Sequence, residues 1–191
     1  TSYIRSLIRK GTLEIGAPVK EAVLSEQLGI SRAPIREALQ VLVQEGLITS
    51  EPQKGKHVRQ MTGKEIYDSY VVAGILEGAG VAESLPLWTV VRQMEGKISY
   101  ATKLDELAEI DELFHATLFM ACDNTRLVEM ARTSCATISK YLYYQHWITM
   151  FTPREYADRH HAVAEAVYSR DVKHVETALR DHYKETGLRM A

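Results

Sequence analysis

The apolar pattern after residue 61 constrains the fold most, because it recurs only at helical spacing. No stretch of residues 62–191 alternates apolar and polar side chains in the manner of a half-buried strand. Thr62, Thr152 and Asp171 stand where helix-capping residues are expected. The pattern predicts helices near residues 63–84, 88–101, 103–122, 125–149, 153–169 and 172–189. We therefore expect an all-α antiparallel bundle of about six helices.

Residues 1–61 carry a different pattern, of three short helices followed by a hairpin. A helix that begins near Tyr3 ends at Gly11, and a second runs from about Lys20 to Leu28. A third is expected over residues 32–45, with Ser31 as its capping residue. Two short strands, 47–50 and 56–60, flank a turn that contains proline and glycine. The sequence thus predicts a mostly α protein with two domains, residues 1–61 and 62–191.

Composition narrows the class of protein. The 191 residues are 46% hydrophobic and 25% charged, which is typical of a soluble globular protein. No apolar run reaches the length of about 18 residues that a transmembrane helix needs, and the first residues do not resemble a secretion signal. Cys122 and Cys135 are too few for a disulfide framework. We therefore expect a cytoplasmic protein without a membrane partner.

The charge is distributed unevenly between the two parts of the chain. Residues 1–60 hold nine Lys and Arg against six Asp and Glu, a net charge of +3. Residues 61–191 hold fourteen against nineteen, a net charge of −5, so that the sum is −2. A basic first part suggests contact with nucleic acid, although an excess of this size also arises by chance.

The second and third short helices, joined by Gly29-Ile30-Ser31, fit a helix–turn–helix. Such a motif presents the first residues of its second helix to the major groove of DNA, and the hairpin tip adds two cations around a glycine. The alternative is a small three-helix fold whose arginines are merely solvated. The candidate DNA-binding residues are Ser31, Arg32, Ala33, Arg36, Lys54, Gly55, Lys56 and His57.

The segment from Leu24 to Leu39 (LSEQLGISRAPIREAL) resembles the recognition unit of GntR-family winged-helix transcription regulators, and Leu42 to Val58 continues the likeness into the wing. The resemblance implies that Arg32, Arg36, Gly55 and His57 meet double-stranded DNA. Ala33 departs from the pattern, because family members commonly carry Thr there. Since one winged helix covers only a few base pairs, we expect a homodimer on a palindromic operator.

One carboxylate and three imidazoles in the helical part form a candidate metal site. Asp111 and His115 lie four residues apart, on one face of a helix. His160 and His182 stand ten and eleven positions from the tight turn at residues 170–171, at similar heights on antiparallel helices. Such ligands suit a divalent ion, with Zn favoured over Ni, Mn, Fe or Co. Alternatively, the pair Asp111 and His115 forms a surface ion pair, or the histidines are polar groups without a metal.

The helical part is also similar to the FCD ligand-binding domain that follows many GntR winged helices. The matching pieces are Leu76-Glu77, Asp111 to Leu118, Asn124 to Leu127, His160 to Val167, Asp171 and His182. Metal-binding members place an Asp and three His in slots that fall here on Asp111, His115, His160 and His182. Two features depart from the family: Ala73 replaces an Arg that pairs with an effector carboxylate in many members, and the connection between Glu77 and Asp111 is short.

These observations predict a regulator that responds to a small-molecule effector, most simply a repressor whose helical domain binds a metal and a carboxylate-bearing metabolite. A sensor of the metal itself is a second interpretation. A metal-dependent enzyme is the third, but Glu112, the residue nearest to a general base, turns away from the candidate ligands, so we expect no enzyme. The aromatic stretch over residues 141–147 either lines an effector site or packs in a core.

Overall fold

The computed structural model describes residues 1–84, 91–93, 96–98 and 104–191. The chain forms two compact units, one of residues 1–61 with 136–145 and the other of residues 62–135 with 146–191. The predicted fold class is confirmed, since helices and one two-stranded hairpin account for the regular structure of the described residues. Part of the helix expected over residues 88–101 lies outside them. Within the described residues, no helix combines the length and apolar character needed to cross a membrane.

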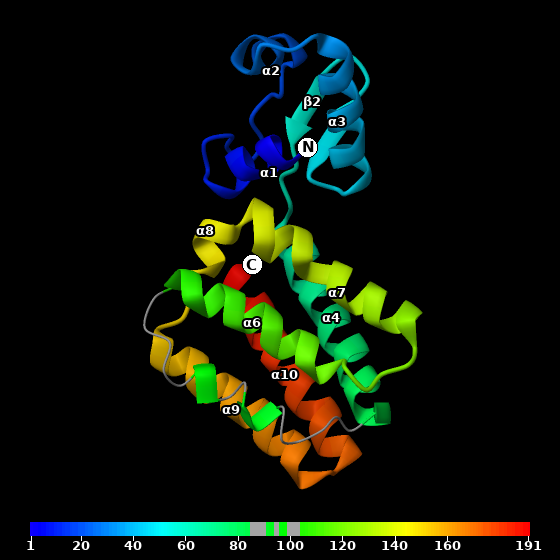
Figure 1. Ribbon diagram of the computed structural model, residues 1–191, viewed down its shortest axis with the longest axis vertical. Coiled ribbons are helices and arrows are strands. Elements are labelled where there is room, and N and C mark those ends of the chain that lie inside the picture. Colours follow the sequence, from blue (N-terminus) through cyan, green and yellow to red (C-terminus); the bar gives the residue numbers. More distant parts are fainter. Residues whose placement is uncertain (85–90, 94–95, 99–103) are drawn as a thin grey trace. The chain divides into compact units, whose positions relative to one another are not determined.

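The first unit contains a winged helix–turn–helix (Figure 1). Its elements are α1 (Ser2–Arg9), α2 (Glu21–Leu28), α3 (Arg32–Gln44), β1 (Ile48–Glu51) and β2 (Gly55–Val58). Gly29 ends α2 with a φ of 64°, a left-handed conformation that glycine adopts without steric cost. Ser31 is the N-cap residue of α3, as the sequence predicts, although its side chain makes no capping hydrogen bond.

Residues 136–145 complete the core of this first unit. The helix expected over residues 125–149 is divided into α7 (Thr125–Thr137), the π-helical turn η1 (Ile138–Leu142) and α8 (Tyr144–Trp147). Leu142 packs in the apolar cluster that also holds Ile4 and Ile8 of α1. The apolar residues of this cluster are Ile4, Ile8, Val19, Leu24, Ile35, Leu39, Leu42, Leu47, Ile48, Val58 and Leu142.

The aromatic stretch of residues 141–147 supplies polar contacts in the same unit. The Tyr143 hydroxyl accepts a hydrogen bond from the Met61 backbone N–H (3.1 Å) and donates one to the Met61 carbonyl oxygen (3.3 Å). The Arg9 guanidinium stacks over the Tyr144 ring, 3.9 Å from its centroid. These contacts favour the packing interpretation of the stretch over the effector interpretation.

The second unit is an all-α bundle. Its helices are α4 (Gly63–Ser84), α6 (Leu104–Leu118), most of α7, α9 (Pro153–Ser169) and α10 (Val172–Met190). Capping interactions set two helix starts where the sequence predicts them. Thr152 and Glu155 form a capping box at the start of α9. The Asp171 carboxylate accepts hydrogen bonds from the backbone N–H groups of Lys173 and His174 at the start of α10. Helix α6 ends at Leu118, four residues before the expected end.

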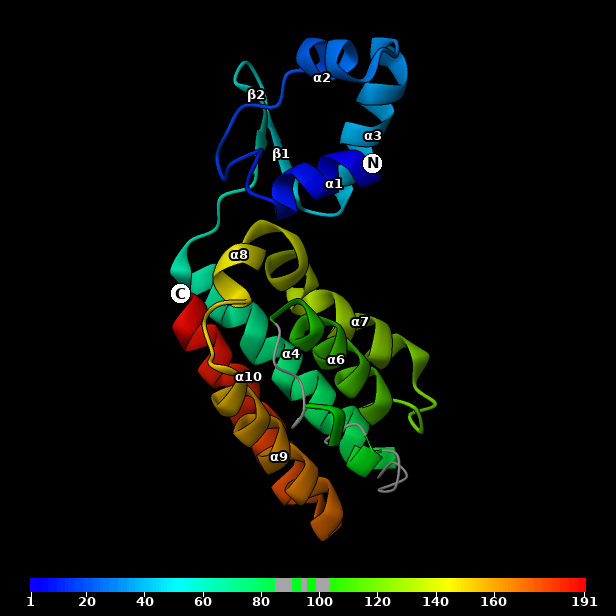
Figure 2. The ribbon, with the colours of Figure 1, turned by 60° about the vertical axis from the view of Figure 1, so that its left-hand side comes forward.

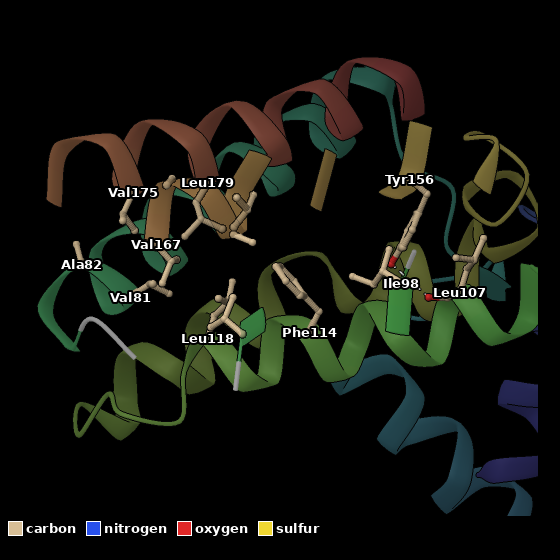
Figure 3. Close-up of a cluster of buried hydrophobic side chains, with 14 of the residues drawn as sticks. Val81, Ala82, Ile98, Leu107, Phe114, Leu118, Tyr156, Val167, Val175 and Leu179 are labelled. Atoms are coloured by element: carbon tan, nitrogen blue, oxygen red, sulfur yellow. Dashed lines mark hydrogen bonds between the residues drawn. The ribbon is translucent and has the colours of Figure 1, made fainter. Parts of the chain in front are cut away.

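The core of the bundle gathers side chains from α4, α6, α9 and α10. Figure 3 shows Phe114 and Leu118 of α6 facing this core, which Val167 of α9 and Leu179 of α10 also line. Phe114, Leu118 and Leu179 are fully buried. Because helical residues point to one face only every three to four positions, this packing also fixes which residues of α6, α9 and α10 approach each other elsewhere along the bundle.

Helices α4 and α10 approach each other closely along their length (Figures 1 and 2). A Cβ atom at Gly74 would lie 2.9 Å from the Tyr183 Cβ atom, and one at Gly187 would lie 2.9 Å from the Tyr70 Cβ atom. Such separations are too short for carbon atoms, so these positions require glycine. The glycines let the backbones of α4 and α10 come close together, so that side chains of one helix reach those of the other.

We expect Gly74→Ala to destabilise the protein by about 1–3 kcal/mol, because the new methyl group forces α4 and α10 apart and outweighs the helix propensity gained. The matched control is Gly96→Ala, where an added Cβ meets no atom within 4 Å. The free energy of unfolding from denaturant titration checks both. Equal effects of the two substitutions would contradict the packing argument.

Candidate metal centre and nucleic-acid interface

The predicted recognition residues lie at the exposed start of α3. The side chains of Ser31, Arg32, Ala33 and Arg36 are all exposed. Arg36 is not unpartnered, however, since its Nε and Nη2 atoms lie 3.2 and 3.1 Å from Oε2 of Glu21 at the start of α2. The arginine side chain remains 68% exposed, so the ion pair orients it without removing it from solvent.

The wing residues divide between its two faces. Gly55 begins β2 with a φ of 83°, and His57 follows on the same face of the strand. Lys56 points to the other face, where its Nζ lies 3.3 Å from Oε1 of Glu21 and its side chain is 21% exposed. Lys54 pairs with Glu51 at 2.7 Å. The sequence did not reveal that one carboxylate, Glu21, contacts both the recognition helix and the wing.

The three predicted histidines meet in the second unit, from three different helices. His115 of α6, His160 of α9 and His182 of α10 each place one potential ligand atom within 4.8 Å of those of the other two. His160 is fully buried and His182 is 9% exposed. Their ring centroids are 4.8 Å apart, and that of His115 is 5.2 Å from that of His182.

Asp111, the fourth predicted ligand, lies beside two of these histidines. Its Oδ1 atom is 3.1 Å from Nε2 of His160 and 3.8 Å from Nε2 of His115. The Tyr156 hydroxyl donates a hydrogen bond to the same oxygen at 2.6 Å. The structure thus brings Asp111 into contact with the histidine cluster, and both candidate Nε2 ligand atoms face its carboxylate.

Several residues that the sequence did not single out as site residues surround the four. Glu77 of α4 is 2% exposed, and its Oε1 accepts a hydrogen bond from Nδ1 of His115 at 2.6 Å. The Tyr183 hydroxyl donates to Oε2 of the same carboxylate at 2.5 Å. Arg159 is largely buried and donates from Nη2 to the His182 carbonyl oxygen at 2.7 Å. No local spacing rule relates Glu77 or Tyr183 to the histidines, so only the tertiary structure reveals them.

Burial and close charges shift the pKa values of these groups in opposite directions. Burial raises the pKa of Asp111, but the hydrogen bond from His160 and the charge of His115 outweigh it and lower the pKa to about 2. Burial lowers the pKa of His115, but the Glu77 carboxylate outweighs it and raises the pKa to about 9. Burial lowers the pKa of His160 and of His182, and the Arg159 charge adds to the effect on His182. The lowered pKa values favour the neutral form of His160 and His182, the form in which an imidazole binds a metal, whereas His115 would have to release a proton on metal binding.

The donor set fits a divalent metal ion in chemistry and in hydrogen bonding. Three imidazoles and one carboxylate are common ligands of Zn²⁺ and of neighbouring transition-metal ions. Nδ1 of His182 is buried and has no hydrogen-bond partner among the described residues. Since buried polar atoms are rarely left unpaired, an imidazole in this state is consistent with a ligand position.

A winged helix followed by a separate all-α unit is the architecture of a DNA-binding regulatory protein. Residues 1–58 match the family model of bacterial regulatory proteins of the gntR family, and residues 75–185 match that of the FCD domain. The chain belongs to the GntR family and carries an FCD domain, which confirms the resemblance seen in its sequence. This family consists of regulatory proteins rather than enzymes, also as the sequence predicts.

Individual relatives agree with this assignment. The HTH-type transcriptional repressor RspR of Escherichia coli (strain K12) is 26% identical over 181 residues, which cover 89% of this chain and 78% of that protein. Alignments with relatives from Paenarthrobacter nicotinovorans and Bacillus subtilis (strain 168) span only 59% and 60% of those proteins. A solved GntR regulator structure from Rhodococcus sp. RHA1 has a TM-score of 0.73 at 22% identity, covering 99% of this chain and 94% of that one, and shares the fold.

Proposed function

We propose that the protein is a transcription repressor whose winged helix binds an operator and whose helical unit binds a divalent metal, Zn²⁺ in first place, together with a small carboxylate-bearing effector. The observation that carries the proposal is the meeting of Asp111, His115, His160 and His182, from three helices, in a chain that begins with a winged helix. Its relatives support repression, since RspR is itself named a repressor.

The exposed start of α3 supports operator binding. Arg32 and Arg36 lie one helical turn apart, and each guanidinium can contact a guanine edge or a phosphate. Glu21 holds Arg36 at its Nε and Nη2 atoms, which limits the positions that this side chain samples before DNA arrives. On the wing, we place Lys54, Gly55, Lys56 and His57 at the DNA, because Lys56 shares Glu21 with Arg36 and so lies beside the start of the recognition helix.

A metal would supply the positive charge that an anionic effector needs. Four protein ligands complete a tetrahedral Zn²⁺ site, so an effector would bind by raising the coordination number to five, or by filling a position on an ion that accepts six. Ala73, where many FCD domains carry an effector-binding Arg, is buried at 1% exposure and offers no charge. We therefore infer that the effector carboxylate would bind the metal directly.

Dimerisation follows from the size of a winged helix, which reads only a few base pairs, and implies a palindromic operator. Both cysteines are free, which agrees with the reducing cytoplasm where such an operator would be found. A second candidate function is sensing of the metal ion itself. It uses the same four side chains, but the bound metal rather than an organic effector changes the affinity for DNA.

Arg36→Ala should weaken binding to the protein's own promoter DNA by about 1–3 kcal/mol if Arg36 contacts a base, because both N–H donors of that contact are lost. Arg126→Ala is the matched control, since Arg126 is an exposed arginine of the second unit, 76% exposed and paired with Glu129. Fluorescence anisotropy at several salt concentrations measures both variants. A wild-type protein without salt-dependent affinity for this DNA would refute operator binding.

Purified protein should contain near-stoichiometric metal by mass spectrometry, and His160→Ala should lose it because a buried ligand is removed. His161→Ala is the control, because the His161 side chain is exposed and is rotated by about 100° around the helix axis from that of His160. Circular dichroism verifies that each variant is folded. No metal in the wild-type protein, even after Zn²⁺, Ni²⁺ or Mn²⁺ is added, would leave the histidines as polar groups and refute the metal site.

The two candidate functions differ in how DNA affinity responds. If the effector is an organic acid, Zn²⁺ alone should leave the DNA affinity unchanged, and small metal-chelating acids should bind the metal-loaded protein but not the stripped one. Calorimetry and anisotropy measure the two effects. A change of DNA affinity of tenfold or more on addition of Zn²⁺ alone, corresponding to about 1.4 kcal/mol, would favour metal sensing instead.

A further inference from the structure

Glu77 is a second buried carboxylate beside the candidate metal ligands. It comes from α4, which supplies none of the four ligands, and it is 2% exposed. A carboxylate removed from water in this way is destabilising unless both of its oxygens are paired. Here Oε1 accepts a hydrogen bond from Nδ1 of His115 at 2.6 Å, and Oε2 accepts one from the Tyr183 hydroxyl at 2.5 Å.

We propose that Glu77 is the positioning residue of the metal site, which holds His115 with its Nδ1 protonated and its Nε2 presented to the metal, and that Tyr183 in turn holds Glu77. The proposal rests on the metal binding proposed above. A carboxylate accepts but cannot donate, so the nitrogen that faces it must carry the hydrogen. The opposite nitrogen, Nε2, lies 3.8 Å from Oδ1 of Asp111, on the side of the other ligands.

The three imidazoles differ in what fixes them. Nδ1 of His160 donates to the Tyr156 backbone carbonyl oxygen at 2.7 Å, a neutral acceptor, whereas Nδ1 of His182 has no partner among the described residues. Among these three histidines and within the described residues, only His115 has a carboxylate at its Nδ1 atom. A negative charge at this position makes the imidazole a stronger donor to a metal, so Glu77 affects affinity as well as orientation.

A second carboxylate also contributes to the charge balance of the site. Neutral imidazoles carry no charge, so only carboxylates among these groups offset the charge of a divalent ion. Asp111 and Glu77 supply two negative charges, one in contact with the ion and one behind His115. These two carboxylates offset part of the charge of a bound divalent ion and of the neighbouring Arg159, which lowers the cost of burying them.

The close contact of α4 and α10 makes this arrangement possible. Gly74 and Gly78, one turn apart, lie on either side of Glu77 in the sequence, and a Cβ at Gly78 would lie 3.2 Å from the Glu176 Cα atom. Without side chains there, α10 comes close enough for Tyr183 to reach the Glu77 carboxylate. The Tyr183 hydroxyl is also 3.4 Å from Nδ1 of His115, so the three groups form one compact set.

The test compares Zn²⁺ affinity among variants of the full chain after the metal has been stripped with a chelator. Glu77→Gln should weaken Zn²⁺ binding by about 10–100-fold, because it keeps the size and an acceptor oxygen but loses the charge. Tyr183→Phe should weaken it less, because Glu77 remains. Glu165→Gln is the matched control, an exposed glutamate of α9, and should change nothing.

A spectroscopic measurement separates positioning from a general loss of structure. In the Zn²⁺-loaded wild-type protein, long-range ¹H–¹⁵N correlations of the imidazoles should show His115 with a proton on Nδ1 and metal on Nε2. The opposite tautomer overturns the proposal whether or not Glu77→Gln folds. Unchanged Zn²⁺ affinity in a folded Glu77→Gln overturns it while leaving the metal site intact. No Zn²⁺ binding by the wild-type protein overturns the metal site and this inference together.

Discussion

Helices α4 and α10 touch almost backbone to backbone, and the geometry of the helical unit depends on this contact. Gly74 and Gly187 remove the side chains that would otherwise separate the two helices. The contact places Glu77 of one helix against Tyr183 of the other. Since His182 precedes Tyr183 in α10, the same contact fixes the height of one candidate ligand relative to the rest.

Electrostatic balance explains why so many polar groups can share one buried region. Asp111 accepts a hydrogen bond from the Tyr156 hydroxyl and lies beside Nε2 of His160, and Glu77 accepts hydrogen bonds from His115 and from the Tyr183 hydroxyl. In a medium of low dielectric constant these pairs stabilise the fold only as a complete set, because removal of one partner leaves an unpaired charge. A cluster of this kind therefore specifies one arrangement of the four helices that contribute to it.

Much of this structure could be predicted from local sequence, because local chemistry determines it. Helix α9 begins and ends where its capping box and the turn at Arg170 indicate. Spacing alone predicts that Asp111 and His115 share a helix face and that His160 and His182 lie at similar heights, whereas the resemblance to FCD domains implies that the two pairs form one site. These relations span a few residues, or two helices joined by a tight turn.

The remainder depends on pairings between distant residues, which periodicity does not encode. Glu77 and His115 are separated by 38 positions, and Tyr183 follows His115 by 68. Lys56 of the wing contacts Glu21, which lies 35 positions earlier in the chain. The helix expected over residues 125–149 is interrupted by the π-helical turn Ile138–Leu142, which lies in a segment that belongs to the first unit, and Leu142 packs in the core of that unit.

That interruption means that the DNA-binding unit is not encoded by a continuous stretch of the gene. A fragment cut after Met61 would leave out Leu142, and the apolar surfaces of Ile4 and Ile8 in the same cluster would lose part of their cover. Exchange of the helical domain for another by recombination at this boundary would carry the same defect. Replacement of the bundle at this boundary would therefore need compensating changes in the core of the first unit.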